Sequence, residues 1–200
     1  MSQPKTLFQL AGVTPAPHAL ADSALLLIDM QREYRDGVLA LPDVGPAAAQ
    51  AAELLAKARA AGRPVIHVQH RGAGGSGGPF DVETDRFKIL ETLTPEAGEG
   101  LVEKSLPNSF AGTDLAERIA ALGGKSLIVG GFMTHMCVSS TVRAALDLGV
   151  PCTVVAGACA TRDLPDGAGG KVAADSLHRM EIAALSDRFA MIAERAAAIV

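Results

Sequence analysis

The chain of 200 residues has no tryptophan and one tyrosine, so it lacks the aromatic platforms on which single-stranded nucleic acid stacks. Its net charge of −4 provides no attraction for nucleic acid or for an anionic membrane surface. Cysteine is also scarce, since Cys137, Cys152 and Cys159 form neither a C-x-x-C pair nor a zinc-binding spacing. We therefore expect a small-molecule substrate, and neither nucleic acid nor a membrane as partner.

Long apolar runs are missing as well. No stretch of about 18 consecutive apolar residues occurs, which argues against a spanning helix. The opening residues, MSQPKTLFQL, lack the basic and apolar regions of a signal peptide. A sparse, odd set of cysteines is typical of reduced thiols. These features predict a cytoplasmic protein.

The residues that are present predict one domain of the α/β class. Apolar residues make up 48% of the chain, enough for a full core. Residues 1–22 carry three prolines and indicate an N-terminal arm, and residues 23–200 indicate the domain. Strands are predicted at residues 24–29, 64–70, 101–104, 127–129, 150–156 and 189–192, and helices at residues 45–61, 114–122, 137–149 and 170–185. This alternation predicts a three-layer α/β/α sandwich around a parallel, Rossmann-like sheet of about six strands.

Two local expectations accompany that pattern. Thr113 is expected to cap the helix at residues 114–122. The glycine-rich residues 71–80, RGAGGSGGPF, indicate a flexible loop, and the segment as far as residue 100 resembles an excursion outside the core.

Cys137 is the principal reactive candidate. It opens a helical pattern after an apolar run and the corner GGFMTH. A cysteine in the first turn of a helix lies near unpaired backbone N–H groups, which stabilise a thiolate. The same groups can bind an oxyanion. The alternative is a small, inert side chain packed in the core.

Asp29 and Lys104 each end another predicted strand. Sites in sheets of this kind form at the carboxyl ends of the strands, so these two residues and Cys137 should meet at one edge. A thiol nucleophile needs a base for its proton and a cation near its charge, and this set supplies both. The alternatives are an aspartate that caps a loop and a solvated lysine.

Other motifs carry less weight. The loop contains G-x-G-x-x-G at Gly72, Gly74 and Gly77, but no helix begins there to meet a pyrophosphate. His67 and His70 stand three apart in a strand and point to opposite faces, which disfavours a shared metal ion. We therefore expect no cofactor and no metal.

Four segments together resemble the isochorismatase-like cysteine hydrolases over almost all of residues 24–192. They are ALLLIDMQREY, LVEKSLPNSFAGTDL, LIVGGFMTHMCVSSTVRAALDLG and PCTVVAGACATRD. The resemblance implies the fold of that family and an Asp29–Lys104–Cys137 triad that cleaves a small amide or other C–N bond. It also implies a cis peptide bond between Phe132 and Met133, with the N–H groups of Met133 and Cys137 as oxyanion hole.

The chain departs from relatives in two places. HVQHRGAGGSGG lacks the Asp-x-His of the metal-dependent nicotinamidase branch, and Gly157-Ala158 replaces an Asp-Ala pair. Two alternative functions stay open, namely an isochorismatase-type vinyl-ether hydrolase and a non-catalytic or redox-sensing thiol protein.

The remaining expectations concern the pocket and the assembly. The residues proposed for the pocket wall are Tyr34, Phe110, Phe132, His135 and Met136, with core packing as the alternative for the aromatic ones. His135 is also an alternative base for Cys137. Similar proteins are often homo-oligomers, and we expect the same here.

Overall fold

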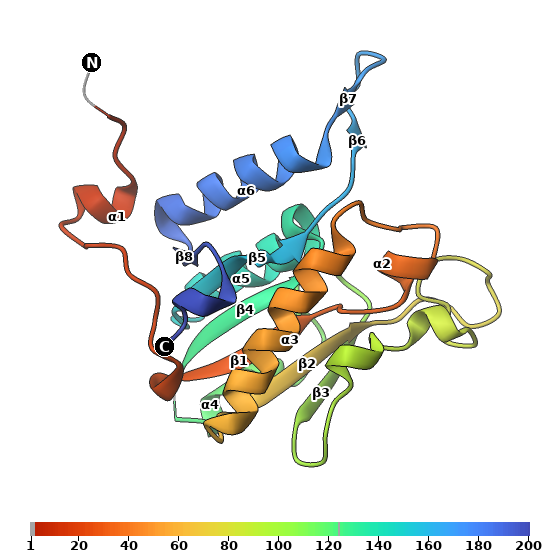
Figure 1. The fold of residues 1–200 in the computed structure, drawn as a ribbon, viewed down its shortest axis with the longest axis horizontal. Coiled ribbons are helices and arrows are strands. Elements are labelled where there is room, and N and C mark those ends of the chain that lie inside the picture. Colours follow the sequence, from red (N-terminus) through yellow and green to blue (C-terminus); the bar gives the residue numbers. More distant parts are fainter. Residues whose placement is uncertain (1–2, 124) are drawn as a thin grey trace.

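The computed structural model describes residues 3–123 and 125–200, and within them six parallel strands form the main sheet. The sheet order is β3-β2-β1-β4-β5-β8 (Figure 1). The strands are β1 Ser23–Ile28, β2 Val65–His70, β3 Gly100–Lys104, β4 Ser126–Phe132, β5 Cys152–Ala160 and β8 Met191–Ala193. The helices are α1 Leu7–Leu10, α2 Glu33–Asp36, α3 Val44–Ala60, α4 Leu115–Ala121, α5 Ser139–Asp147 and α6 Ala174–Arg188. The predicted fold is confirmed.

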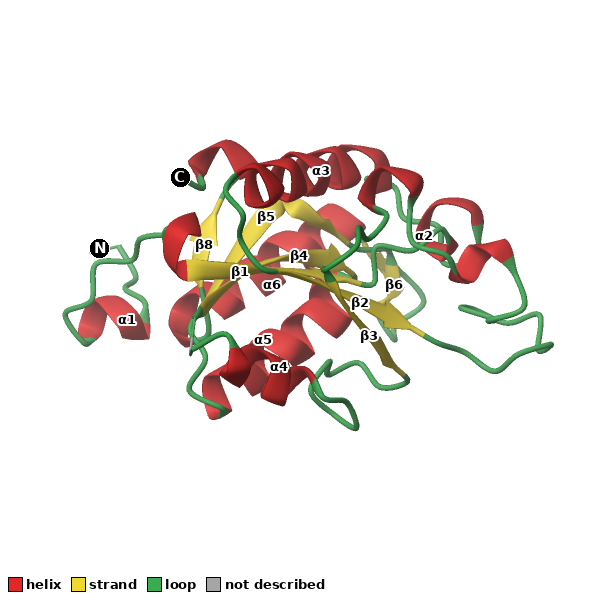
Figure 2. Cartoon of the chain, turned by 90° about the horizontal axis from the view of Figure 1, so that it is seen from below, coloured by secondary structure: helices red, strands yellow, loops and turns green. Residues whose placement is uncertain are grey.

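Helices cover the sheet on both faces, with α3 on one side and α4 and α5 on the other (Figure 2). Strand β1 shows why its sequence is a continuous apolar run. Leu25 and Leu27 pack in the cluster under α3, and Leu26 and Ile28 pack in the cluster with α4 and α5. A strand buried on both faces has no polar side to present.

Strand β5 continues four residues beyond its predicted end at residue 156. A register shift between Val129 and Gly131 of β4 realigns the two strands, so that Gly131 pairs with Cys159 and Phe132 with Ala160. Such a bulge lets a strand change register without ending. The glycine at position 157 therefore does not end the strand as the sequence suggested.

Two helix starts also differ from prediction. Asp114 occupies the N-cap position of α4 but makes no side-chain capping bond. The Thr113 hydroxyl accepts the N–H of Leu115 at 3.3 Å, as a capping side chain does, and also donates to the Ser109 carbonyl at 2.6 Å. Helix α6 begins at Ala174 because the preceding residues form a hairpin of β6 (Leu164–Pro165) and β7 (Lys171–Val172).

Part of residues 71–100, the segment predicted to lie outside the core, packs inside the core. Phe80, Leu90 and Leu93 are buried in the cluster under α3. The glycine loop has internal order, because the carboxylate of Asp81 accepts N–H bonds from Gly75 and Gly77 at 3.0 and 2.8 Å. The prediction that residues 71–100 are all excursion is wrong for these positions.

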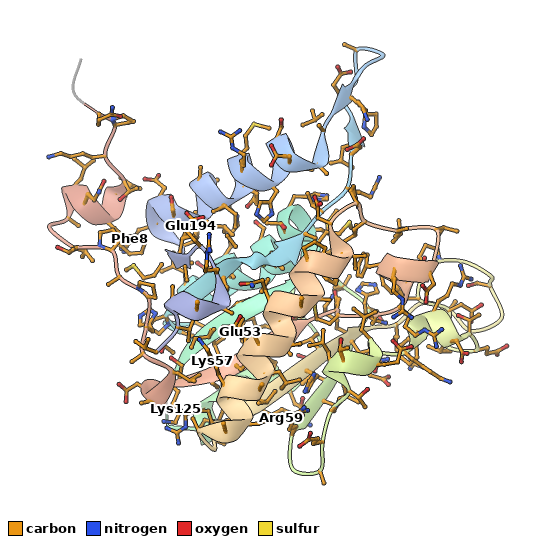
Figure 3. All side chains as sticks on the ribbon, viewed as in Figure 1. Phe8, Glu53, Lys57, Arg59, Lys125 and Glu194 are labelled. Carbon is orange, nitrogen blue, oxygen red and sulfur yellow. The ribbon has the colours of Figure 1, made fainter. Side chains whose placement is uncertain are left out.

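The N-terminal arm lies along the domain. The N–H of Leu7 donates to the Asp187 carboxylate at 2.8 Å, and the Arg188 guanidinium stacks over Phe8, which is labelled in Figure 3. At the other end of the chain, Lys57 of α3 donates to the Ala196 carbonyl at 2.8 Å. The division at residue 22 stays a prediction. Among the described helices, none is both long and apolar enough to cross a membrane.

Gly131 is a position where the sheet requires glycine. A Cβ there would lie 2.5 Å from the Ile28 carbonyl oxygen and 2.7 Å from the Ile28 Cβ. We expect Gly131→Ala to lower the free energy of unfolding by about 1–3 kcal/mol, since neighbouring backbone must move. Urea denaturation measures this. The control is Gly45→Ala in α3, where a Cβ meets nothing within 4 Å, and unchanged or higher stability is expected there. Equal midpoints for the two variants would contradict the prediction.

Candidate active site

The candidate site lies where the sheet order reverses direction between β1 and β4. Asp29 directly follows β1, His70 and Lys104 end β2 and β3, and Cys137 lies in a single π-helical turn, Thr134–Val138, after β4. Because the strands are parallel, all four residues reach the same edge of the sheet. This is the point at which doubly wound sheets bind ligands.

The structure brings the three residues predicted for catalysis together, with Lys104 between the other two. Its Nζ lies 2.7 Å from Oδ2 of Asp29 and 3.3 Å from Sγ of Cys137. Both side chains of the Asp29–Lys104 pair are fully buried. A buried ion pair must be closely paired to offset its lost hydration, and this one meets that condition.

Asp29 carries a second carboxylate oxygen with no protein partner. Oδ1 is buried and accepts no hydrogen bond within the described part of the chain. Burial raises the pKa of this carboxyl, and the charge and hydrogen bond of Lys104 limit the rise. The residue also has a positive φ of 53°, which is uncommon for a non-glycine residue. An unpartnered, buried oxygen with a raised pKa is suited to accept a proton.

The surroundings of Cys137 favour the neutral thiol over the thiolate. Its side chain is almost buried, with 4% of its surface exposed. Burial and the negative charge of Asp29 raise the pKa of the thiol to about 12, although Lys104 acts in the opposite sense. Sγ lies within 4.8 Å of a carboxylate oxygen of Asp29. The proton must therefore leave during the reaction and not before it.

The corner before Cys137 fixes the backbone around the sulfur. The peptide bond between Phe132 and Met133 is cis. The Met133 carbonyl accepts N–H bonds from Met136 and Val138 at 3.0 and 3.3 Å. Within the described residues, the N–H groups of Met133 and Cys137 donate to no backbone carbonyl outside the turn.

The residues predicted for the pocket wall have different surroundings. Tyr34 and Phe132 are buried, with ring centroids 5.5 Å apart, and Phe110 packs partly buried against the α4–α5 cluster. Met136 is 38% exposed. Nδ1 of His135 lies 2.5 Å from the Thr161 hydroxyl, which turns this imidazole to a partner other than Cys137. The assignment of these residues to the pocket stays a prediction.

His70 is a site residue that the sequence analysis missed. Its Nδ1 lies 2.9 Å from Nζ of Lys104. The available signal was the same one that identified Asp29 and Lys104, namely a polar residue at the carboxyl end of a strand. His70 was weighed only as a metal ligand, together with His67.

One group of side chains is close enough together to hold a metal ion, but Lys104 lies among them. Asp29, His70 and Cys137 each offer one donor atom, and these atoms lie within 4.8 Å of one another. Lys104 Nζ, however, is within hydrogen-bonding reach of all three residues. A divalent cation at the same donors would face the ammonium charge at contact distance.

Comparison with known proteins gives a consistent result. A family model described as an isochorismatase domain matches residues 23–197. A crystal structure of an isochorismatase from Pseudomonas putida KT2440 has a TM-score of 0.93 at 42% identity, covering 99% of this chain and 100% of that one. An uncharacterized isochorismatase family protein, YddQ of Bacillus subtilis, is 43% identical over 71% of this chain and 79% of its own length. The secreted isochorismatase effector Isc1 of Verticillium dahliae is 35% identical over 90% of this chain and 92% of its own.

The buried ion pair predicts a pH-dependent loss of stability in Lys104→Met. Removing the ammonium leaves the Asp29 carboxylate unpaired, which should cost about 3–5 kcal/mol at neutral pH. When folding raises the pKa of a carboxyl, the free energy of unfolding falls as the pH rises from the unfolded-state pKa to the folded-state pKa. Because the variant raises that folded pKa further, the loss should be smaller at pH 5 than at pH 8. Urea denaturation at both values measures it.

Lys88→Met is the matched control, since its ammonium pairs with Asp85 at 2.6 Å on the surface. Exposed pairs contribute little, so stability should change little at either pH. A loss in Lys104→Met that is the same at pH 5 and pH 8 would contradict the coupling to Asp29.

Proposed function

Because the chain belongs to the isochorismatase family of hydrolases, we propose that it cleaves a small amide or other C–N bond through a covalent intermediate on Cys137. The observation that supports this most directly is the Lys104 ammonium, which bonds both the thiol and one oxygen of Asp29 and leaves the second oxygen free. A nucleophile, a cation and a proton acceptor therefore meet in one buried cluster.

Two named relatives support cleavage of a C–N bond. A streptothricin hydrolase of Streptomyces noursei is 35% identical over 71% of this chain and 51% of its own length. A ureidoacrylate amidohydrolase, RutB of Stutzerimonas stutzeri, is 30% identical over 64% of this chain and 66% of its own. Their substrates differ, so the relatives support the reaction class and leave the substrate open.

In the proposed mechanism, Oδ1 of Asp29 takes the thiol proton as Sγ attacks the substrate carbonyl carbon. The N–H groups of Met133 and Cys137 hold the developing oxyanion. The C–N bond then breaks, and Asp29 returns the proton to the leaving nitrogen. A thioester remains on Cys137. Asp29 next takes a proton from water as the water attacks the thioester, and the released thiolate recovers a proton as the acid departs.

The charge of Lys104 has a separate role in this sequence. It lies 3.3 Å from the sulfur and stabilises the thiolate as the thiolate leaves from the second tetrahedral intermediate. It also holds Oδ2 of Asp29, which leaves Oδ1 as the oxygen that handles protons. No cofactor enters any of these steps.

Cys137→Ala should abolish turnover, because the proposed acyl-enzyme forms on its sulfur. The assay is ammonia or acid release from a panel of small amides, ureas and carbamoyl compounds. The control is Cys152→Ala, a cysteine that is equally buried and whose raised pKa has no lysine to oppose it. With a substrate in hand, intact mass should show an acyl adduct on wild type only. Full activity of Cys137→Ala would overturn the mechanism, and pyruvate release from isochorismate would favour the vinyl-ether alternative.

Asp29→Asn should lower kcat by about 10²–10⁴-fold, since the amide keeps the shape of the carboxyl but cannot accept the proton. In wild type, activity should fall as acid protonates Asp29, at a pH above the usual carboxyl range because burial raises its pKa. Steady-state kinetics against pH tests both statements. Asp22→Asn, at an exposed position, is the control and should keep wild-type kcat. An unchanged kcat in Asp29→Asn would exclude Asp29 as the base.

The protein is also proposed to be a homo-oligomer. Helix α6 buries only Ala174 and Leu185, and Met180 on it is 56% exposed, which leaves apolar surface for a second copy. The cytoplasmic location stays a prediction, and the name of the Isc1 relative describes a secreted protein.

A further inference from the structure

His70 contacts the catalytic cluster, although the proposed mechanism does not use it. His70 and Lys104 are register partners on the neighbouring strands β2 and β3, so their side chains leave the sheet on the same face. This places Nδ1 of His70 2.9 Å from Nζ of Lys104. The contact therefore follows from sheet geometry and is not an accident of a flexible side chain.

Hydrogen-bond accounting assigns the tautomer of His70. The Lys104 ammonium has three N–H donors and no acceptor. Its three neighbours are Oδ2 of Asp29, Sγ of Cys137 and Nδ1 of His70. Nδ1 must therefore accept, which places the imidazole proton on Nε2. Burial and the charge of Lys104 lower the pKa of His70 to about 4, in agreement with a neutral ring.

Neighbouring side chains hold both the backbone and the ring of His70. The side chain of the buried Gln31 accepts from the N–H of His70 and donates to its carbonyl, each at 2.8 Å. Phe80 packs against the imidazole with ring centroids 4.8 Å apart. A backbone clamp and a packed face leave the ring little freedom to leave Lys104.

The second nitrogen of this ring has no partner. Within the described residues, Nε2 of His70 makes no hydrogen bond. This nitrogen is not one of the buried polar atoms without a partner, so it is accessible to solvent. The residue itself is only half-buried. The two ring nitrogens are separated by one carbon, so the Nε2–H bond is directed away from Lys104 and toward solvent-accessible space. One nitrogen of this ring lies within 4.8 Å of Sγ of Cys137, so the ring that presents this N–H is close to the sulfur.

We propose that His70 positions Lys104 through Nδ1 and binds an oxygen of the substrate through its Nε2–H. The substrate class is then a carbonyl compound with an oxygen acceptor beside the reacting carbon. The substrate half of this inference rests on the proposed function, and the positioning half does not. Alkylation of Cys137, which needs no substrate, therefore tests His70 even if no C–N bond is cleaved.

The positioning half is tested with His70→Leu and His70→Asn. Leucine removes both ring nitrogens, and the asparagine oxygen can take the place of Nδ1. For His70→Leu we expect the iodomethane reaction of Cys137 at pH 7.5 to slow about 10-fold, because a charged group loses a hydrogen bond. His70→Asn should keep the wild-type iodomethane rate. A wild-type rate in His70→Leu would overturn this half.

His67→Asn is the matched control. His67 lies on the same strand but bonds Glu99 at 2.9 Å on the opposite face. Its iodomethane rate at pH 7.5 should match wild type, and a loss of rate there as large as in His70→Leu would mean that the strand, and not Nδ1, is responsible. Far-UV circular dichroism establishes that each variant is folded, and His70→Asn carries the test if His70→Leu is not.

The substrate half is tested with two alkylating agents, of which only one has an oxygen. Iodoacetamide offers a carbonyl to Nε2–H, and iodomethane offers none. In His70→Asn the ratio of the iodoacetamide rate to the iodomethane rate should fall about 5-fold, as expected for one lost hydrogen bond. An unchanged ratio would overturn this half. With a substrate found by ammonia release, KM should rise in His70→Asn by a similar factor while kcat stays near wild type.

Discussion

The buried ammonium of Lys104 is the interaction on which the site depends. An ammonium removed from water must find acceptors for its three donors, or its desolvation is not offset. Lys104 finds them on three other strands or strand ends: Asp29 after β1, His70 on β2 and Cys137 beyond β4. The sheet order β3-β2-β1-β4 is what brings these ends beside one another. The strand register and the site therefore depend on each other, because a slip in register would leave the buried Lys104 ammonium without partners.

The same burial determines the resting state of the nucleophile. It raises the pKa of both Asp29 and Cys137, which favours the protonated thiol before a substrate binds. Oxidation by peroxide requires a thiolate that is accessible. A nearly buried thiol with a pKa of about 12 is poorly suited to sensing oxidants. This argument favours the hydrolase over the redox-sensing alternative on physical grounds, independently of the family relationship.

Much of the site could be predicted because one rule covers it: polar residues at the carboxyl ends of parallel strands converge. That rule applied equally to His70, yet the histidine was judged only against metal spacings. The extension of β5 through Gly157 could not be read from the sequence, because it depends on a register shift in the neighbouring strand. Order in the glycine loop likewise depends on Asp81, a single carboxylate that accepts N–H bonds from loop residues four and six positions before it.

Whether the cation at this sheet edge is a metal ion or an ammonium group determines which reactions the site can catalyse. A neutral imidazole, a carboxylate and a thiol could together ligate a divalent ion, which would polarise a carbonyl as a Lewis acid. Lys104 occupies their common space and offers hydrogen-bond donors instead. A lysine cannot bind a carbonyl oxygen while its three donors are engaged, so the oxyanion must be held elsewhere. The backbone N–H groups of Met133 and Cys137 lie beside the sulfur. In the described structure, neither of them bonds a backbone carbonyl outside the turn. In the proposed mechanism, the engagement of Lys104 therefore assigns the oxyanion to the corner that precedes Cys137.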